Sequence, residues 1–149
     1  MKPRVSLRDL VPDAFTGVTE MERYNRRHVD PMHYEMLKVR ASILNGCAFC
    51  LDMHVTDWLR RGADPRKVTA VTTWHDAPFF DAQERALLAL TDEVTRLGEQ
   101  GVTDATWDEA IVQFGAEGVG NLLFAIATIN VWNRLQISTR TPPPIDPAG

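Results

Sequence analysis

The sequence predicts an all-α protein, a bundle of about six to seven helices. Asp-Pro pairs at positions 30–31 and 64–65 are typical of a helix N-cap followed by the first helical residue. Asp81 and Glu84 have the spacing of a capping box, with Asp in place of Ser or Thr. No stretch alternates apolar and polar residues between hairpin turn signals, so we expect no strands.

Prolines and glycines set the expected limits of each helix. Prolines at positions 3 and 12 make residues 1–12 look irregular. The Asn45-Gly46 pair ends the second helix, because both residues tolerate the left-handed conformation. Gly62 stops the third helix, and glycines at 98 and 101 close the fifth. The expected helices cover residues 13–28, 31–44, 47–61, 65–73, 81–97, 103–114 and 117–136, with a loop at 74–80 and a flexible junction at 115–120.

Two of the expected helices carry clear apolar faces. In the fifth helix the residues expected to point inward are Leu87, Leu88, Leu90, Val94 and Leu97. The apolar residues of the last helix are Leu122, Leu123, Phe124, Ile126, Ile129 and Val131. A helix that is apolar over most of its surface lies at the centre of its domain or is buried against another subunit. We therefore expect a homo-oligomer.

The length, charge and composition of the chain indicate one domain and limit the kinds of molecule that it can bind. The chain of 149 residues fits one domain, which we place at residues 1–138, followed by a proline-rich tail at 139–149. The formal net charge of −4 argues against nucleic acid as the main partner. Apolar stretches such as 119–131 are too short and interrupted to span a bilayer, and the N-terminus lacks the apolar run of a signal peptide. We expect a cytoplasmic protein without a membrane partner.

Both cysteines lie in one C-x-x-C motif, Cys47 and Cys50, and His54 follows four residues later. If Cys47 opens a helix, all three side chains share one helical face. Glu35 precedes the first cysteine by twelve residues, which a straight helix would place about 18 Å away. The Asn-Gly break permits Glu35 to fold back beside the cysteines. In the cytoplasm such a motif is more often redox-active or metal-binding than a structural disulfide.

These four residues favour thiol redox chemistry. The thiolate is the reactive form of cysteine, and its pKa falls at a helix N-terminus, which favours Cys47. Cys50 is closer along the helix to His54, which could accept or relay a proton, while Glu35 could orient the imidazole. The set suits a thiol peroxidase. One thiolate attacks the peroxide and becomes a sulfenic acid, the other condenses with it to a disulfide, and a dithiol donor reduces the pair.

Other interpretations of the same residues stay open. The cysteines could be ordinary buried hydrophobes. With His54 and Glu35 they could instead form a zinc site, although a second ligand pair of the usual finger type is absent from the sequence. The remaining candidates are expected to be solvated, capping or packing residues: His28, His33, His75, Glu84, Trp58, Trp74, Trp107 and Trp132.

Residues 35–54 follow the pattern E-x11-C-x2-C-x3-H, and Ser42 and the Asn-Gly pair complete the string SILNGCAFCLDMH. In this pattern the chain resembles the carboxymuconolactone decarboxylase-like superfamily, in its alkylhydroperoxidase AhpD branch. Trp74, the ERALLAL run that begins at Glu84 and the NVWNRL run at 130–135 look like the same branch. The resemblance covers roughly residues 12–136.

The resemblance implies an all-helical subunit that assembles into trimers or hexamers and reduces organic hydroperoxides. It implies that Cys50 forms the sulfenic acid, that Cys47 donates a proton and resolves it, and that His54 and Glu35 form a proton relay. The helix dipole favours the opposite order, but its contribution of about 1 kcal/mol or less can be outweighed. Some relatives carry a histidine between the cysteines, where this chain has Phe49. No bound cofactor is expected, and an external dithiol, lipoylated in AhpD proper, would supply electrons.

Two other functions are open at this point. A decarboxylase of a muconolactone-type substrate has no evident need for a C-x-x-C, so Cys47 and Cys50 argue against it. A non-enzymatic zinc-stabilised or redox-sensing oligomeric module would be recognised by bound metal, or by a disulfide that forms without peroxide turnover.

Overall fold

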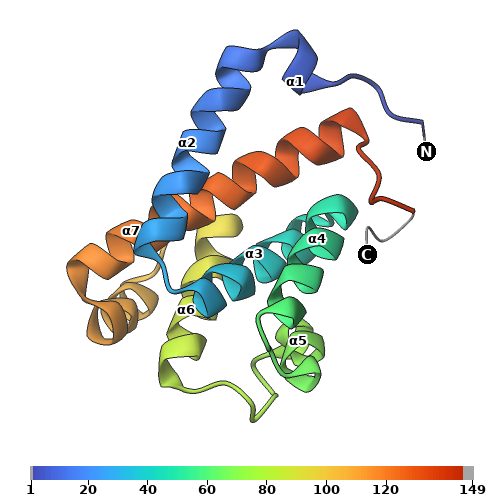
Figure 1. The fold of residues 1–149 in the computed structure, drawn as a ribbon. Helices are drawn as coiled ribbons and strands as arrows, with labels where there is room; N and C mark the ends of the chain where they lie inside the picture. The colour runs from blue at the N-terminus through green and yellow to red at the C-terminus, as the bar shows by residue number, and fades with distance from the viewer. Residues whose placement is uncertain (1, 146–149) are drawn as a thin grey trace.

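The computed structural model describes residues 2–145, which form helices and an isolated bridge between Gly98 and Gly101. The predicted all-α class is confirmed. The elements are α1 (Leu7–Leu10), α2 (Pro12–His28), α3 (Pro31–Asn45), α4 (Ala48–Arg60), α5 (Pro65–Ala70), the 3-10 turn η1 (Val71–Thr73), α6 (Ala82–Thr95) and α7 (Asp104–Thr139). The helix α3 lies in the middle and packs against α2, α4, α6 and α7 (Figure 1).

Local capping explains where the helices begin. The Asp30 side chain accepts hydrogen bonds from two backbone N–H groups in the first turn of α3. Asp64 caps α5 with one such bond, which the Arg66 backbone N–H donates. At the start of α6 both halves of the capping box are present, because Asp81 accepts from the Glu84 backbone and the Glu84 side chain accepts in return. These starts agree with the predicted ones.

The turn between α3 and α4 positions the motif. Gly46 has φ 71° and ψ 33°, the left-handed conformation that ends α3. Cys47 is the N-cap of α4, so the prediction that it opens the helix is wrong by one residue. The Asn45 side-chain amide donates to Asn130 at 3.0 Å and to Asn133 at 2.9 Å, both on α7. These bonds fix the turn against the last helix.

Two other predicted limits are wrong. Residues 1–12 are not wholly irregular, since they include α1. The predicted junction at 115–120 is reduced to Gly115, with φ 69° and ψ 168°, and the chain is helical again directly after it. One glycine suffices because this backbone region is open to glycine alone, and it bends α7 at the lower left of Figure 1. The helix continues to Thr139, whose carbonyl accepts the Arg4 N–H at 2.9 Å, and residues 146–149 of the predicted tail lie outside the described range.

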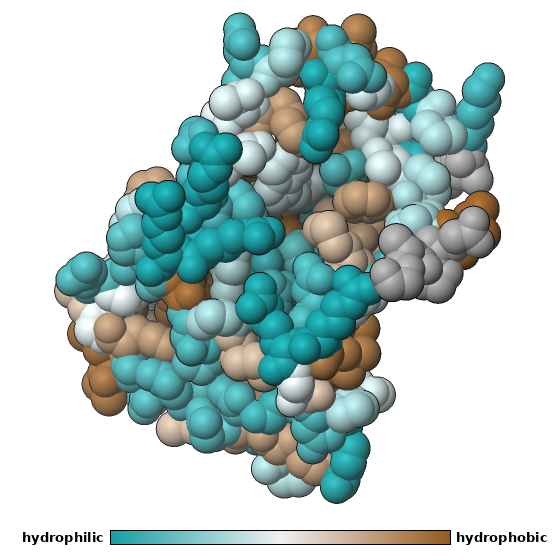
Figure 2. Space-filling view, in the orientation of Figure 1, coloured by the Kyte–Doolittle hydropathy of each residue, from teal (hydrophilic) through white to brown (hydrophobic). Residues whose placement is uncertain are grey.

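The core follows the predicted apolar faces in part. Leu87, Leu88 and Leu90 are fully buried, whereas Leu97 is 67% exposed because α6 ends before it. On α7 one stripe is buried, and Phe124 on another side is 58% exposed. Figure 2 shows a mostly hydrophilic face with apolar residues in separate patches.

Within residues 2–145, α7 is the single helix that is long and apolar enough to cross a membrane by length and composition. Its most apolar window of 18 residues has a mean hydropathy of 1.5, and 28% of that window is buried. Core helices of soluble proteins meet the same criterion. The absence of a membrane partner stays a prediction.

The kink in α7 leads to a stability prediction. Gly115→Ala should lower the free energy of unfolding by about 1–3 kcal/mol, because an added Cβ strains this backbone conformation although no neighbouring atom is within 4 Å. Urea denaturation measures the change. Gly17→Ala in α2, also with open space around it, is the control and should be stabilising by about 0.5–1 kcal/mol. Equal effects of the two substitutions would contradict the strain argument.

Candidate active site

The two cysteines are in direct contact at the start of α4. Their Sγ atoms lie 2.6 Å apart, both thiols are free, and each residue is 1% exposed. The backbone N–H of Cys50 donates to Cys47 Sγ at 3.4 Å, as an N-cap side chain allows. A pair this close needs little movement to form a disulfide.

The thiols differ in their acidity. The pKa of Cys47 is lowered to about 7, chiefly because the Cys50 thiol stabilises the Cys47 thiolate through a hydrogen bond, with further help from backbone N–H groups and Asn133. The pKa of Cys50 is raised, because its proton is held by Cys47 and because it is buried. Near neutral pH the pair therefore carries at most one negative charge, which resides on Cys47.

His54 and Glu35 meet across the α3–α4 turn. His54 Nδ1 lies 3.1 Å from Glu35 Oε2, and both side chains are almost fully buried. When the imidazole is neutral, this contact places its proton on Nδ1 and leaves Nε2 free to take up a proton. Burial lowers the pKa of His54 in spite of the hydrogen bond to Glu35, so the imidazole is neutral at pH 7.

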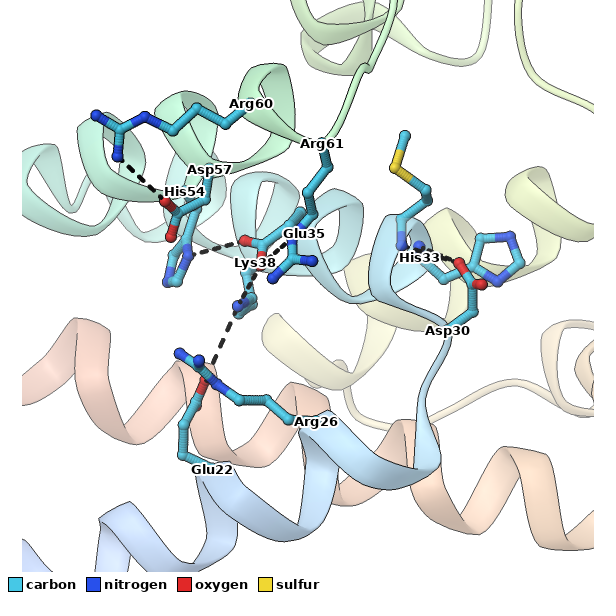
Figure 3. Close-up of polar contacts among 11 residues, drawn as sticks. Glu22, Arg26, Asp30, His33, Glu35, Lys38, His54, Asp57, Arg60 and Arg61 are labelled. Carbon is cyan, nitrogen blue, oxygen red and sulfur yellow. Dashed lines mark hydrogen bonds and ion pairs between the residues drawn. The ribbon is translucent and has the colours of Figure 1, made fainter.

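Three charged side chains surround this pair, and the sequence analysis missed all of them. Lys38 Nζ lies 3.0 Å from Glu35 Oε1 and 3.8 Å from Glu22 Oε1, and Arg61 Nε lies 3.5 Å from Glu35 Oε1 (Figure 3). Burial raises the pKa of Glu35, but the bond to His54 and the charge of Lys38 outweigh this and lower it. The spacing of Lys38, one turn after Glu35 on the same helix, was the available signal.

A pocket connects part of the site to solvent. It has a volume of about 250 Å³, and both Cys50 and His54 are among its lining residues, whereas Cys47 is not. Its apolar walls come from four residues of α2, α4 and α7: Phe15, Phe49, Met53 and Trp132. Of the two sulfurs, the one that a molecule in this pocket would contact is therefore that of Cys50.

The zinc site considered from the sequence is not formed in the described part of the chain. Within residues 2–145, the group of possible metal ligands whose donor atoms lie within 4.8 Å of one another is Glu35, His54 and Asp57, without the cysteines. The carboxylate of Glu35 already faces Lys38 and Arg61, and these cations oppose a metal ion there.

The other polar and aromatic candidates lie outside this group. Glu84 caps α6 and pairs with Lys67 at 2.6 Å. Trp58 and Trp74 are buried and Trp107 is 40% exposed, and none of the three lines the pocket of Cys50 and His54. The three remaining histidines each contact an aromatic ring: His28 on Tyr24, His33 on Phe114 and His75 on Trp74.

Comparison with known proteins identifies the family. A family model described as the carboxymuconolactone decarboxylase family matches residues 9–93. The uncharacterized protein YdfG of Bacillus subtilis (strain 168) is 30% identical over 139 residues, which are 93% of this chain and 95% of the relative. The chain belongs to the carboxymuconolactone decarboxylase family. The resemblance stated from the motif is confirmed.

Three solved structures share the fold of this chain. A crystal structure from Agrobacterium tumefaciens, of unknown function and suggested to be the antioxidant defence protein AhpD, has a TM-score of 0.93 and 34% identity, covering 97% of this chain and 100% of that one. The debrominase Bmp8, solved with 2,3,4-tribromopyrrole, has a TM-score of 0.80 at 16% identity, covering 92% and 74%. A peroxidase-related protein from Silicibacter sp. TM1040 has a TM-score of 0.75 at 22% identity, covering 87% and 70%. The last two show the fold alone.

The contact between the sulfurs leads to a titration prediction. In the reduced protein, thiolate absorbance near 240 nm should rise with a midpoint of about pH 7, and this belongs to Cys47. Cys50→Ala removes the thiol that donates to Cys47, so the midpoint should move toward the ordinary value for cysteine. Cys47→Ser should abolish the titration near pH 7. A midpoint that persists there in Cys47→Ser would contradict the assignment.

Proposed function

We propose that the protein is a thiol-dependent peroxidase that reduces organic hydroperoxides with the Cys47–Cys50 pair. The observation that carries this proposal is the contact of two free thiols, one of which shares a pocket with His54. Two thiols whose sulfurs lie 2.6 Å apart can be oxidised to a disulfide and reduced again. The apolar walls of the pocket suit an organic rather than an inorganic peroxide.

The sulfur that a substrate can reach and the sulfur that ionises first belong to different cysteines. Proton transfer between the two cysteines makes both observations compatible with one mechanism. Cys50 lines the pocket but holds its proton, while Cys47 ionises first but does not line the pocket. Their close contact allows the Cys50 proton to pass to Cys47 when the peroxide is bound. Cys50 is then the attacking thiolate and Cys47 the protonated partner.

The first chemical step breaks the O–O bond. The Cys50 thiolate attacks the terminal oxygen of the hydroperoxide, so sulfur is oxidised to the sulfenic acid and the alkoxide leaves. The alkoxide takes the proton from the Cys47 thiol and departs as the alcohol. Cys47 is thereby returned to the thiolate, next to the oxidised sulfur.

The second step forms the disulfide. The Cys47 thiolate attacks the sulfenic sulfur of Cys50 and displaces hydroxide. His54 takes up a proton from solvent at Nε2 and passes it to this hydroxide, giving water, while Glu35 stabilises the transient imidazolium. An external dithiol, whose own thiols become a disulfide, restores the pair.

We also propose a homo-oligomer in the cytoplasm, a trimer or hexamer as the resemblance implies. Apolar and aromatic side chains remain exposed along α2 and α7, with Tyr24 at 44%, Phe124 at 58% and Val112 at 75%. An exposed apolar surface of this kind is typical of a subunit interface. Analytical ultracentrifugation of the purified protein measures the state, and a monomer would contradict this part of the proposal.

The roles of the cysteines can be separated by substitution. Cys47→Ser should form a sulfenic acid at Cys50 that dimedone traps, at a rate lower by about 10²-fold because the nearby base is lost. Cys50→Ser should form none. Intact mass after one equivalent of cumene hydroperoxide measures both, and reduced wild-type protein should lose both thiols to one internal disulfide. The reverse pattern in the two variants would exchange the roles, and two unreacted thiols in the wild type would refute the peroxidase proposal.

The proton relay gives a second test of this function. His54→Gln and Glu35→Gln should each slow disulfide formation by about 10²-fold or more, because hydroxide must then leave without a positioned acid. Stopped-flow quenching with a thiol reagent measures the rate. Far-UV circular dichroism is the control, since a large loss of helical signal would make these residues structural instead.

A further inference from the structure

We infer that Lys38 is a positioning residue, which holds the Glu35 carboxylate against His54 and ties both to Glu22 of α2. The sequence motif does not specify this lysine, which occupies one of its variable positions, and its effect on the reaction rests on the proposed function of His54 and Glu35. Its contacts are visible in Figure 3, where Lys38 lies between the two carboxylates.

The surroundings of Lys38 are unusual for a lysine. The residue is 1% exposed and is among the largest fully buried side chains of the described chain. Its ammonium group also lies 3.9 Å from the centre of the Tyr34 ring. Lysine is rarely removed from water in this way unless it is paired, and here its partners are two carboxylates and an aromatic face.

The carboxylate of Glu35 has separate partners for its two oxygens. Oε1 faces Lys38 at 3.0 Å and Arg61 at 3.5 Å, and Oε2 faces His54 Nδ1 at 3.1 Å. A bond at Oε1 therefore fixes the rotation that aims Oε2 at the imidazole. Arg61 is the weaker anchor, since its side chain is 44% exposed and its contact is longer.

The charge of Lys38 also acts on His54 directly. The charged or titratable groups around the imidazole contact it, contact its partner Glu35 or line the same pocket. They are Arg8, Glu22, Arg26, Glu35, Lys38, Cys50, Asp57 and Arg61, and Arg60 is paired to Asp57. Glu35 and Glu22 raise the pKa of His54, and Lys38 lowers it. Burial is the main reason why the pKa of His54 is lowered, and the charge of Lys38 lowers it further, so that a proton taken up at Nε2 is readily passed on.

The same lysine connects the relay with the pocket wall. Glu22 and Arg26 are bonded to each other at 3.3 Å on α2, and both line the pocket that Cys50 and His54 share. Through Glu22, Lys38 fixes this wall to α3. One buried cation therefore contacts both the Glu35 carboxylate of the relay and a carboxylate of the pocket wall.

The test is an NMR titration of His54 in reduced protein without peroxide, with the His54 signal assigned from its loss in His54→Gln. In Lys38→Met the pKa of His54 should rise by roughly 1, because the nearest positive charge is lost and Glu35 is then balanced by the imidazolium and the half-exposed Arg61. Disulfide formation with cumene hydroperoxide should slow by about tenfold or more. Lys38→Arg keeps the charge and should return the pKa of His54 toward the wild-type value.

The matched control is Lys67→Met. Lys67 forms a lysine–glutamate pair of similar length with Glu84, but this pair joins α5 to α6 and does not line the pocket. Its loss should leave the titration of His54 and the rate of disulfide formation unchanged. An equal effect of both substitutions would overturn the inference, because it would reflect general destabilisation.

The remaining outcomes are also decisive. An unchanged pKa of His54 in Lys38→Met overturns the inference even if peroxide is still reduced. If Lys38→Met does not fold, Glu22→Gln is measured instead. In that variant the pKa of His54 should fall, because the charge of Glu22 raises it in the wild type. An unchanged pKa of His54 in Glu22→Gln also overturns the inference. Because the titration needs no peroxide, the inference stands if His54 responds but the wild-type protein reduces no hydroperoxide, and only the proposed function fails.

Discussion

The left-handed turn at Gly46 is the constraint on which the site depends. It reverses the chain between α3 and α4, so that Glu35 and His54 lie 3.1 Å apart although 19 residues separate them. The same turn leaves Cys47 at the N-cap, where its sulfur accepts the Cys50 N–H. Tertiary contacts hold the turn in place, because Asn45 is bonded to two asparagines of α7. Motif spacing and helix packing therefore act together, and neither would assemble the site alone.

Stability does not account for the charges that this turn brings together. Replacing a buried ion pair with apolar residues of similar size is often neutral or stabilising, whereas removing one partner costs about 3–5 kcal/mol. Glu35, Lys38 and His54 are all at least 95% removed from solvent in their side chains, yet each keeps a charged or polar partner. The benefit of such a cluster is a defined orientation. A neutral imidazole with one nitrogen held by a carboxylate presents its other nitrogen in one tautomer.

Local rules made the fold class and most helix starts predictable, because a cap such as Asp30 or Asp81 acts within one turn of its own helix. The motif likewise predicted that Glu35, Cys47, Cys50 and His54 belong to one site. The features that could not be predicted from the sequence depend on contacts between segments that are far apart in the chain. In the sequence Lys38 is one of many polar helix residues, and its contact with Glu22 of α2 depends on how the two helices pack. The break in α7 is at Gly115, whereas the glycines that follow it have helical backbone angles, and the sequence alone does not distinguish between them.

In the mechanism that we propose, the geometry also separates the acid–base tasks of the two chemical steps. The base nearest to the Cys50 proton is the Cys47 sulfur at 2.6 Å, so activation of the attacking thiol does not require the imidazole. His54 is then available for the hydroxide that leaves in the second step, and the lowered pKa of the imidazole makes its protonated form a better acid for that purpose. Ionisation of Cys47 and access at Cys50 are compatible on this account, because the sulfur that ionises first in the resting pair need not be the one that attacks.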